Sequence, residues 1–394
     1  MKTYKKLDKC LCCGNKNLIK FLDLKEQPLA NNLVQNTTDD YYTFPLVVNY
    51  CSSCWHSQLS ISVDPEILFR DYYYVTGTSN TMHEYCEKLA KILHSKINKE
   101  DISILDVASN DGTFLDKFNQ YGWNLFGIDP AENLQHLSKK KGIKTYVNFF
   151  GVDDVKFDRK FDVITALNVF AHVANPLKFL KECYSNLSKD GVIVIQTSQR
   201  DMIEKRQFDT VYHEHISFFS LKSMETICSN AGLFINDVYL PDIHGGSYVF
   251  FISKEDKKTN NVNNRMAYEQ TCGRYSDEIY STFQENISSL EYQLKENLKD
   301  KKTIGFGAAA KGVVAIHALN LDIDFIVDEN PLKVGKMLPE RSIPIRGIES
   351  LNTKEDLNIV VLPWNFKKEI TEKIQTIRGH RDNIVSIFEL GEKK

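Results

Sequence analysis

Several features that mark other protein classes are missing from this sequence. It has no run of about eighteen apolar residues, so we expect no membrane-spanning helix. Its 49 Lys and Arg side chains are balanced by 52 Asp and Glu side chains, a formal net charge of −3. Proteins that bind nucleic acid mainly through phosphates carry a basic surplus instead. Residues 1–20 are rich in lysine and lack an apolar core, so we expect no signal peptide. These absences predict that neither nucleic acid nor a membrane is a partner.

A framework of paired, secreted-type cysteines is also missing. The chain has nine cysteines, an odd number, and most of those outside the N-terminal segment occur singly in apolar stretches. This pattern is typical of a reducing compartment. We therefore predict a cytoplasmic protein, present as a monomer or a weak homo-oligomer.

Four of the cysteines form two C-x2-C pairs about 37 residues apart. Two such pairs can place four thiolates tetrahedrally around Zn²⁺, which closes the coordination sphere and makes the site structural. Four unrelated buried cysteines are the alternative. Cys12 could replace its neighbour in the first pair, but the spacing favours the regular pair, and His56 is expected to be a bystander. The predicted ligands are Cys10, Cys13, Cys51 and Cys54.

Length and hydrophobic patterning predict four segments in an α/β protein. At 394 residues the chain is long enough for two or three domains. From residue 102 to about 253 strand and helix patterns alternate, which predicts a doubly wound parallel sheet, and a second alternation begins at Thr303. The predicted segments are a small cysteine module (1–68), a Rossmann-like domain (69–255), a helical linker (256–300) and a second Rossmann-like domain (301–394).

The turn after the first strand of the first Rossmann-like domain fits S-adenosylmethionine. Small polar residues and a glycine lie between strand and helix, so the backbone can approach a ligand and the helix N-terminus favours a carboxylate. An acid ends the next strand, where acids commonly bind ribose hydroxyls. The turn lacks G-x-G-x-x-G, which weakens a dinucleotide interpretation, and an unused crevice is the alternative. The predicted cofactor contacts are Asp106, Ala108, Asn110, Asp111, Gly112, Asp129, Pro130 and Asn168.

The tetrad Tyr212-His213-Glu214-His215 brings a phenol, two imidazoles and a carboxylate together. A methyltransferase that first makes a carbon nucleophile needs a base, a group that orients it and donors for the oxyanion. We predict His215 as the base, and Glu214 as the group that orients it or stabilises its protonated form. Tyr212 and His172 are the predicted donors, since His172 follows a central strand at the same expected edge. Structural histidines and a metal site at His213 and His215 are the alternatives.

Two other segments are expected at this edge of the sheet. The aromatic run that contains Tyr72 and Tyr74 comes just before the domain and is predicted to form a lid over the site, with a packed aromatic hinge as the alternative. The turn His244-Gly245-Gly246 falls between the last two strands and is predicted to contact the substrate.

The second Rossmann-like domain begins with a glycine turn of its own. Gly307 lies between a strand and a helix, and Asp328 follows it by about twenty residues, a pattern that by itself favours NAD. A redox cofactor beside a methyl donor would be an unusual pair, however, and Lys311 could form an ion pair with a diphosphate. We therefore favour contact of Gly307, Lys311 and Asp328 with a nucleotide diphosphate on the substrate. A purely structural turn and NAD remain alternatives.

Together these motifs resemble the nucleotide-sugar C-methyltransferases of deoxysugar biosynthesis, three-domain enzymes with an N-terminal zinc module. The resemblance spans nearly the whole chain, and the tetrad and the second glycine turn are its specific parts. It also rests on the two cysteine pairs, Gln27-Pro28-Leu29-Ala30-Asn31, Asp71-Tyr72-Tyr73-Tyr74, Asn110-Asp111-Gly112, Asn168 to His172, His244-Gly245-Gly246-Ser247 and Pro363-Trp364-Asn365.

The resemblance implies methyl transfer to C3′ of a nucleotide-linked 4-keto-deoxysugar. In such enzymes the keto group acidifies the adjacent C–H, a histidine of the tetrad removes the proton, and the enolate attacks the sulfonium methyl. The matching motif carries this role to His215, with Tyr212, Glu214 and His172 as partners. Ala108 departs from the family, which usually has a glycine there. A zinc-containing methyltransferase for RNA or for another small molecule is the runner-up, but it leaves the tetrad and the last domain without a use.

Overall fold

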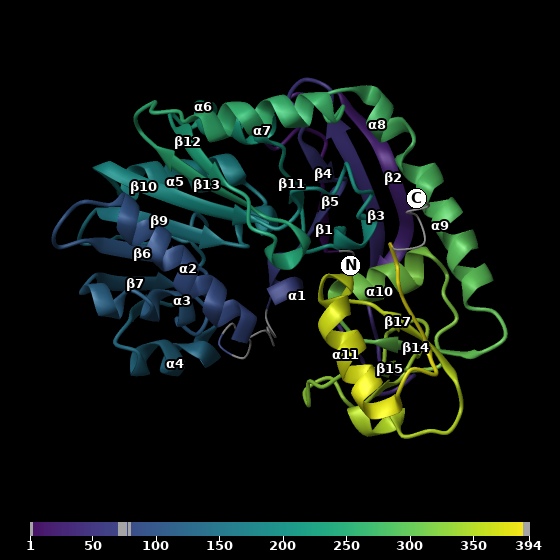
Figure 1. Ribbon diagram of the computed structural model, residues 1–394. Helices are drawn as coiled ribbons and strands as arrows, with labels where there is room; N and C mark the ends of the chain where they lie inside the picture. The colour runs from purple at the N-terminus through teal and green to yellow at the C-terminus, as the bar shows by residue number, and fades with distance from the viewer. Residues whose placement is uncertain (1–2, 70–76, 78–79, 389–394) are drawn as a thin grey trace.

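The computed structural model describes residues 3–69, 77 and 80–388. The predicted lid residues Tyr72 and Tyr74 lie outside the described residues. Figure 1 shows the first Rossmann-like domain on one side, and the cysteine module and the second Rossmann-like domain together on the other. In the described part of the chain, no helix combines the length and the apolar character needed to cross a membrane.

The cysteine module is a small antiparallel sheet that borrows a strand from the next domain. Its sheet has the order β11-β4-β3-β2, and β1 pairs separately with β5. The borrowed strand β11 pairs with β4 through Ser217↔Gln58 and Phe218↔Ser57. The tetrad therefore lies directly before a strand that belongs to the cysteine module's sheet. The elements are β1 (Tyr4–Lys6), β2 (Leu18–Pro28), β3 (Thr43–Cys51), β4 (Ser57–Leu59), β5 (Ile61–Val63), α1 (Pro65–Phe69) and β11 (Ser217–Phe218).

The first Rossmann-like domain has a seven-stranded sheet in the order β12-β13-β10-β9-β6-β7-β8. The buried runs in β6 and β9 form its centre, as expected for strands covered on both faces. The elements are α2 (Asn80–Lys96), β6 (Ser103–Val107), α3 (Thr113–Asp116), β7 (Asn124–Ile128), α4 (Gln135–Lys140), β8 (Lys144–Tyr146), β9 (Phe161–Leu167), α5 (Pro176–Asn186), β10 (Leu187–Thr197), α6 (Leu221–Asn230), β12 (Phe234–Tyr239) and β13 (Tyr248–Ser253).

The prediction of a wholly parallel sheet was wrong at one edge. β13 runs antiparallel to both β10 and β12. The connection 240–247 between β12 and β13 explains the difference, because a parallel pair needs a crossover of about a dozen residues or more. The short connection places the His244 turn at the end of the sheet where the chain leaves β10.

Three helices join the two Rossmann-like domains: α7 (Asn260–Thr271), α8 (Asp277–Ser281) and α9 (Phe283–Asn297). The predicted helical linker (256–300) thus consists of three helices, and Thr282 separates α8 from α9. In Figure 1, α7 lies over the first Rossmann-like domain, whereas α9 runs down beside β2 towards the second.

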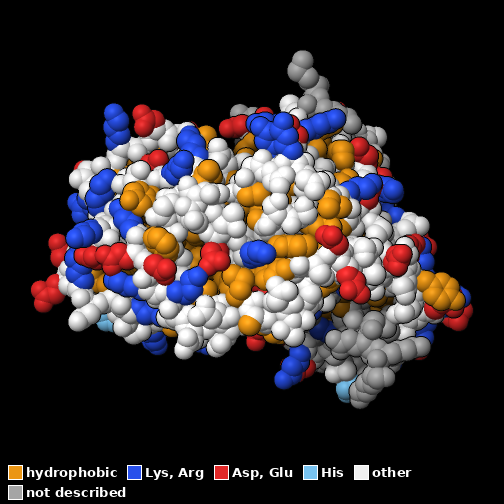
Figure 2. Space-filling model, turned by 90° about the horizontal axis from the view of Figure 1, so that it is seen from above, with side chains coloured by type: hydrophobic (Ala, Val, Ile, Leu, Met, Phe, Trp, Pro, Cys, Tyr) orange, Lys and Arg blue, Asp and Glu red, His pale blue; other side chains and the backbone are white. Residues whose placement is uncertain are grey.

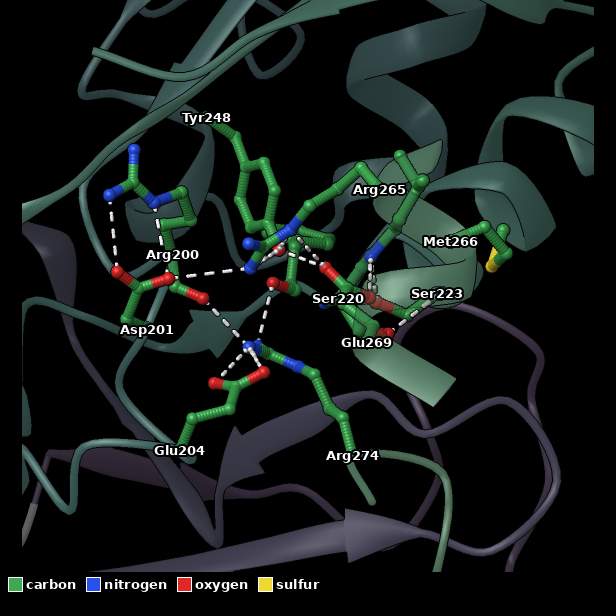
Figure 3. Close-up of polar contacts among 12 residues, drawn as sticks. Arg200, Asp201, Glu204, Ser220, Ser223, Tyr248, Arg265, Met266, Glu269 and Arg274 are labelled. Carbon is green, nitrogen blue, oxygen red and sulfur yellow. Dashed lines mark hydrogen bonds and ion pairs between the residues drawn. The ribbon is translucent and has the colours of Figure 1, made fainter. Parts of the chain in front are cut away.

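A buried network of arginines and carboxylates attaches α7 to the first Rossmann-like domain (Figure 3). Arg265 of α7 donates to Asp201 at 3.3 Å and to the Tyr248 hydroxyl at 2.7 Å, and this hydroxyl donates to Glu269. Removal of one member would leave an uncompensated buried charge, which typically costs about 3–5 kcal/mol. The network thus holds α7 firmly on this domain, although the segment was expected to be a linker.

The second Rossmann-like domain has a parallel sheet in the order β16-β15-β14-β17-β18. Its core is continuous with that of the cysteine module, because Leu46, Phe208 and Val313 belong to one buried cluster. Charged side chains of both signs are interspersed over the face in Figure 2. The elements are β14 (Lys302–Phe306), α10 (Ala310–Ala318), β15 (Ile326–Val327), β16 (Ile345–Arg346), β17 (Leu357–Val361), α11 (Lys367–Arg378) and β18 (Asn383–Ser386).

Candidate active site

The turn between β6 and α3 has an irregular backbone that suits close approach to a ligand. Ala108, Asn110 and Gly112 all have positive φ angles, of 54°, 52° and 77°. A left-handed conformation costs about 1–2 kcal/mol for a residue with a Cβ, so Ala108 is strained where a glycine would not be. The Ala108 amide donates to the carbonyl of Ile128 at 2.7 Å, which ties the turn to the end of β7.

Asp129 follows β7 and joins the two strand ends. Its carboxylate accepts the amide of Asn110 at 2.8 Å and that of Ala131, beyond Pro130, at 2.8 Å. Burial raises the pKa of Asp129, although these two amides oppose the effect. Each carboxylate oxygen has lone pairs beyond those used here. Asp129 therefore shapes the turn and can also accept hydroxyl groups of a ribose.

The other acids of this turn differ in their surroundings. Asp106 lies inside the sheet and accepts the Thr165 hydroxyl at 2.5 Å. Burial, partly offset by Thr165, raises the pKa of Asp106 to about 7. Asp111 is bound by Lys141 at 3.1 Å and by the Thr113 hydroxyl at 2.7 Å, and these contacts outweigh its burial and lower its pKa. Both acids thus hold the turn in shape from within the protein.

Asn168 lies at the end of β9 in a left-handed conformation, with φ 57°. Its side-chain Oδ1 is buried and has no hydrogen-bond partner among the described residues. Buried polar atoms are normally paired, so this oxygen fits a donor such as the methionine ammonium of S-adenosylmethionine. With Asp129 for the ribose, the residues at this edge suit that cofactor.

In the tetrad, His215 has both ring nitrogens engaged. Nδ1 donates to the carbonyl of Thr210 at 2.7 Å, because a carbonyl can only accept. Nε2 lies 2.8 Å from the hydroxyl of Tyr212, which donates to it when the ring is neutral. Burial first, and then the charges of His172 and Lys311, lower the pKa of His215 well below its usual range. His215 is therefore neutral near pH 7, with its lone pair on Nε2.

We predicted that Glu214 would orient His215 or stabilise its protonated form. The group that orients His215 is instead the carbonyl of Thr210. The Glu214 carboxyl instead accepts the Asn31 side-chain amide at 2.9 Å, and burial raises its pKa. His213 donates through Nε2 to the carbonyl of Phe44 at 3.2 Å. Asn31 and Phe44 belong to the cysteine module, so two of the four tetrad residues are held by it.

His172 joins the tetrad from the loop after β9. Its Nδ1 donates to the backbone carbonyl of Glu214 at 2.7 Å, and its ring centre is 5.0 Å from that of His215. The structure thus brings His172, Tyr212 and His215 together, as the clustering of histidines in the sequence predicts. His213 faces the cysteine module rather than His215, which makes a shared metal site at these two residues unsuitable.

The turn His244-Gly245-Gly246 lies against the second Rossmann-like domain. All three residues have positive φ, and a Cβ at Gly245 would come within 2.6 Å of the Trp364 ring. The main-chain amide of Arg200 donates to the carbonyl of Gly246 at 3.3 Å. Glycine is therefore required where this turn meets the second domain. Burial lowers the pKa of His244 to about 4.

The glycine turn of the second domain holds one acid and faces two lysines. Asp328 accepts the amide of Ala308 at 2.7 Å, and Lys333 donates to the carbonyl of Ala308 at 2.7 Å. Lys311, from the first turn of α10, donates to the carbonyl of His244 at 3.1 Å. At Gly307 a Cβ would lie 2.6 Å from Pro363. Lys311 therefore reaches the edge that carries the tetrad.

Sequence patterns predicted Asn168, Glu214 and His244 in this region but missed Gln199 and Asp209. Buried polar atoms that lack a partner among the described residues gather on the connections leaving β9, β10 and β12, and such atoms fit a polar ligand. For Asp209 and Thr210 the one available signal was their position just before the tetrad in the sequence. Asn31 and Trp364 gave no such signal, because the residues that they contact, Glu214 and Asp209, are far away in the sequence. These buried atoms belong to Asn168, Gln199, Asp209, Glu214 and His244.

The two cysteine pairs form one group. The sulfurs of Cys10 and Cys54 are 3.5 Å apart, as are those of Cys13 and Cys51, and all four lie within 4.8 Å of one another. A tetrahedral site with Zn–S bonds of about 2.3 Å requires similar spacings. The donor set fits a closed structural zinc site with the regular pairs as ligands, and neither Cys12 nor His56 belongs to the group.

A groove of about 600 Å³ lies elsewhere, between β2 and the helices α8 and α9. Phe21, Tyr50, Asp277 and Tyr280 are among its lining residues. None of the residues predicted to bind cofactor or substrate lines it, so we place the chemistry at the tetrad, where the histidines meet the polar strand ends.

Three family models match the chain in succession. They are described as "Putative zinc binding domain" over residues 10–69, "Methyltransferase domain" over 78–236 and "C-methyltransferase C-terminal domain" over 242–388. The C-methyltransferase NovU of Streptomyces niveus is 29% identical over 385 residues, which cover 93% of this chain and 92% of the relative.

Other likenesses cover less of the chain. A ubiquinone biosynthesis O-methyltransferase of Rhodopseudomonas palustris is 27% identical over 121 residues, 29% of this chain and 47% of the relative. The structure of magnesium protoporphyrin IX methyltransferase from Synechocystis PCC 6803 with bound SAH covers 49% of this chain and 100% of its own, with 12% identity and a TM-score of 0.39. The three consecutive domain matches and the relative aligned over nearly the full length identify this chain as an S-adenosylmethionine-dependent C-methyltransferase with an N-terminal zinc-binding module.

Proposed function

We propose that the protein methylates C3′ of a nucleotide-linked 4-keto-deoxysugar by way of an enolate. The observation that carries the proposal is the arrangement of the buried His215 imidazole between Thr210 and Tyr212. Its Nδ1 proton is held by Thr210 and its Nε2 lone pair lies 2.8 Å from the Tyr212 hydroxyl. Methylation of a ready nucleophile would need no such base, whereas methylation at carbon does.

His215 takes the C3′ proton on Nε2, since Nδ1 is already protonated. The electron pair of the C–H bond then moves towards the 4-keto oxygen, which becomes an enolate. A histidine base is weak towards carbon unless this oxyanion is stabilised. The Tyr212 hydroxyl is released from Nε2 when that nitrogen gains the proton, and becomes a donor to the oxyanion. His172, whose ring centre is 5.0 Å from that of His215, is proposed as a second donor.

The methyl group comes from a cofactor held at the first domain. S-adenosylmethionine supplies an electrophilic methyl to the carbon nucleophile and leaves as the neutral thioether. Asp129 is proposed to bind the ribose hydroxyls and Asn168 the ammonium of the methionine part. The proton on His215 then returns to solvent.

The nucleotide diphosphate of the substrate is proposed to bind at the second domain. Gly307 and Asp328 form its turn, and Lys333 adds a cation beside it. A diphosphate placed between the two domains would put the attached sugar within reach of His215.

Exchange of hydrogen at C3′ tests the proposal directly. Incubation with a panel of 4-keto-6-deoxy nucleotide sugars in D₂O, without the methyl donor, should introduce deuterium at C3′. The variant His215→Asn should abolish the exchange, while Cys272→Ser, a change at a cysteine far from the tetrad in sequence, serves as the matched control. Methyl transfer to oxygen or nitrogen instead of carbon, with no exchange at C3′, would refute the proposal.

A further inference from the structure

Lys311 belongs to the second domain, but its surroundings are those of the tetrad. Its ammonium donates to the carbonyl of His244 at 3.1 Å and lies 4.9 Å from the centre of the Trp364 ring. Apart from this carbonyl and the ring, no hydrogen-bond acceptor is recorded for it among the described residues. Burial lowers the pKa of Lys311, while the charge of Asp209 opposes that effect. Because the effective dielectric constant is low around a buried ammonium, its charge interacts strongly with nearby titratable groups.

Asp209 links this cation to the base. Its Oδ2 accepts the indole N–H of Trp364 at 2.7 Å, and its Oδ1 is buried without a partner among the described residues. The next residue, Thr210, is the one whose carbonyl holds His215 Nδ1 at 2.7 Å. The second domain thus grips the chain one residue away from the group that orients the base.

We propose that Lys311 and Trp364 of the second domain, acting with Asp209, form an interdomain clamp that positions His215 and keeps its imidazole unprotonated. The clamp works in two ways. Trp364 fixes the Asp209–Thr210 segment and so the direction of the His215 ring. Lys311 adds a positive charge beside that ring, which opposes protonation of Nε2 in the free enzyme. These three are positioning residues, because they act through His215 rather than on the substrate.

The charged and titratable groups that face His215 come from four elements. They are His172 after β9, Tyr212 beside it in the tetrad, His244 before β13 and Lys311 on α10. Of these, Lys311 is the one whose ordinary pKa lies well above neutral pH, so it is the cation of the group. Removal of its charge should therefore raise the pKa of His215, whereas a change at His172 or His244 would remove a neutral ring.

A positioning role for Lys311 is distinct from a role in binding the diphosphate. It rests on the proposed function only in the test that measures turnover. A diphosphate contact would make Lys311→Met raise KM for the nucleotide sugar and weaken binding of a nucleoside diphosphate. A positioning role would lower kcat and leave nucleoside diphosphate binding nearly unchanged. Lys333→Met is the matched comparison, because Lys333 lies at the same turn but donates to Ala308 instead.

The first test needs no substrate. The ring protons of His215, assigned by comparison with His215→Asn, are titrated by NMR in the wild type, Lys311→Met, Lys311→Arg and Lys333→Met. We expect the His215 titration to move to higher pH in Lys311→Met and to return towards the wild-type curve in Lys311→Arg. Lys333→Met should leave it in place. An unchanged titration in Lys311→Met would overturn the inference.

The second test measures turnover. Lys311→Met should lower kcat by about 10- to 100-fold, the loss typical of a misplaced catalytic group. It should also move the acidic limb of the plot of kcat against pH to higher pH. Trp364→Phe, which keeps a ring but loses the indole N–H, should lower kcat without weakening nucleoside diphosphate binding. A rise in KM alone would overturn the inference. If wild-type protein methylates no keto-sugar while the NMR shift persists, the clamp stands and the proposed function fails.

Discussion

The two Rossmann-like domains use the same backbone plan at their first turns and put different side chains on it. In each, the first residue of the turn donates to the last carbonyl of the neighbouring strand at 2.7 Å, and an acid after that strand accepts an amide of the turn. Each acid also donates its own amide to the next strand's end at 3.0 Å. The corresponding residues are Ala108, Ile128, Asp129 and Tyr146 in the first domain and Gly307, Val327, Asp328 and Arg346 in the second.

The difference lies in what surrounds this common frame. One residue before the strand end, the first domain has the buried acid Asp106, where the second has Gly305 with no space for a Cβ. The second domain instead places Lys311 and Lys333 at its turn. The comparison teaches that the same backbone frame is surrounded by a buried acid in the first domain and by two lysines in the second, and this difference underlies our proposal of an anionic ligand for the second domain.

The largest effect should come from the proposed base, His215, which lies at the first domain's edge. His215→Asn removes the Nε2 lone pair while keeping a side chain that can donate to Thr210. We expect kcat to fall by about 10²- to 10⁴-fold, the usual contribution of a general base. Calorimetry should find adenosylmethionine and nucleoside diphosphate bound as before. Equal loss of ligand binding would mean that the division between the domains is wrong.

The buried acid of the first domain should make stability depend on pH. Because the pKa of Asp106 is raised from 3.8 to about 7, its protonated form is favoured by folding. Its contribution is full below about pH 4 and is lost as pH rises through about 7. Asp106→Asn should therefore raise the free energy of unfolding at pH 8 by about 2–4 kcal/mol and change it little at pH 4.

Urea titrations at the two pH values measure this difference. Asp162→Asn is a useful contrast, because hydrogen bonds to Lys99 and Ser103 outweigh its burial and hold its pKa below the usual range. That variant should be less stable than the wild type at pH 8. A stabilising effect of Asp106→Asn that is the same at both pH values would show that ionisation is not its cause.

Asp129 and Asp328, the corresponding acids of the two domains, should each affect the binding of a different ligand. Asp129→Ala should weaken adenosylmethionine by roughly 10- to 100-fold, the loss expected for a hydrogen bond to a charged group, and leave nucleoside diphosphate unchanged. Asp328→Ala should do the reverse. Isothermal titration with each ligand measures both. If each variant weakened both ligands equally, the acids would be supporting the fold rather than separate sites.

The smallest effects should come from the first turn residues themselves. Ala108→Gly relieves a left-handed conformation at φ 54°, and should stabilise the protein by about 1 kcal/mol or less, since glycine also gains freedom in the unfolded chain. Gly307→Ala creates strain at φ 86° and a contact with Pro363, and should destabilise it by about 1–2 kcal/mol or more. Thermal melts of the two variants should shift in opposite directions.

Much of the frame was predictable from sequence, because buried strands leave a clear apolar pattern. The alternation predicted from residue 102 to about 253 corresponds to a sheet whose strands run from β6, which begins at Ser103, to β13, which ends at Ser253. Strand direction was not predictable from that pattern, since an apolar run is the same in either orientation; the short connection before β13 was the overlooked signal. The zinc ligands were predictable because spacing alone determines which sulfurs can meet.

The orientation of the tetrad was not predictable. Glu214 pairs with Asn31, which is 183 residues away, and Asp209 pairs with Trp364, which is 155 residues away. No local pattern records such contacts, since they arise only when the cysteine module and the second domain pack on the same loop. The charge of Glu214 and its proximity in sequence suggested that it would orient its neighbour His215. In the structure the carbonyl of Thr210 accepts the hydrogen bond from His215 Nδ1 instead.

The pairing of β4 with β11 has a consequence for biosynthesis. β4 ends at Leu59 and β11 begins at Ser217, so the ribosome adds about 150 further residues before the two can meet. Throughout that interval the nascent N-terminal sheet has an exposed strand edge, which invites pairing with other chains. The part of the protein that is made first is thus among the last to be completed. A prematurely terminated chain that stops before Ser217 would keep its metal ligands and still be prone to aggregate.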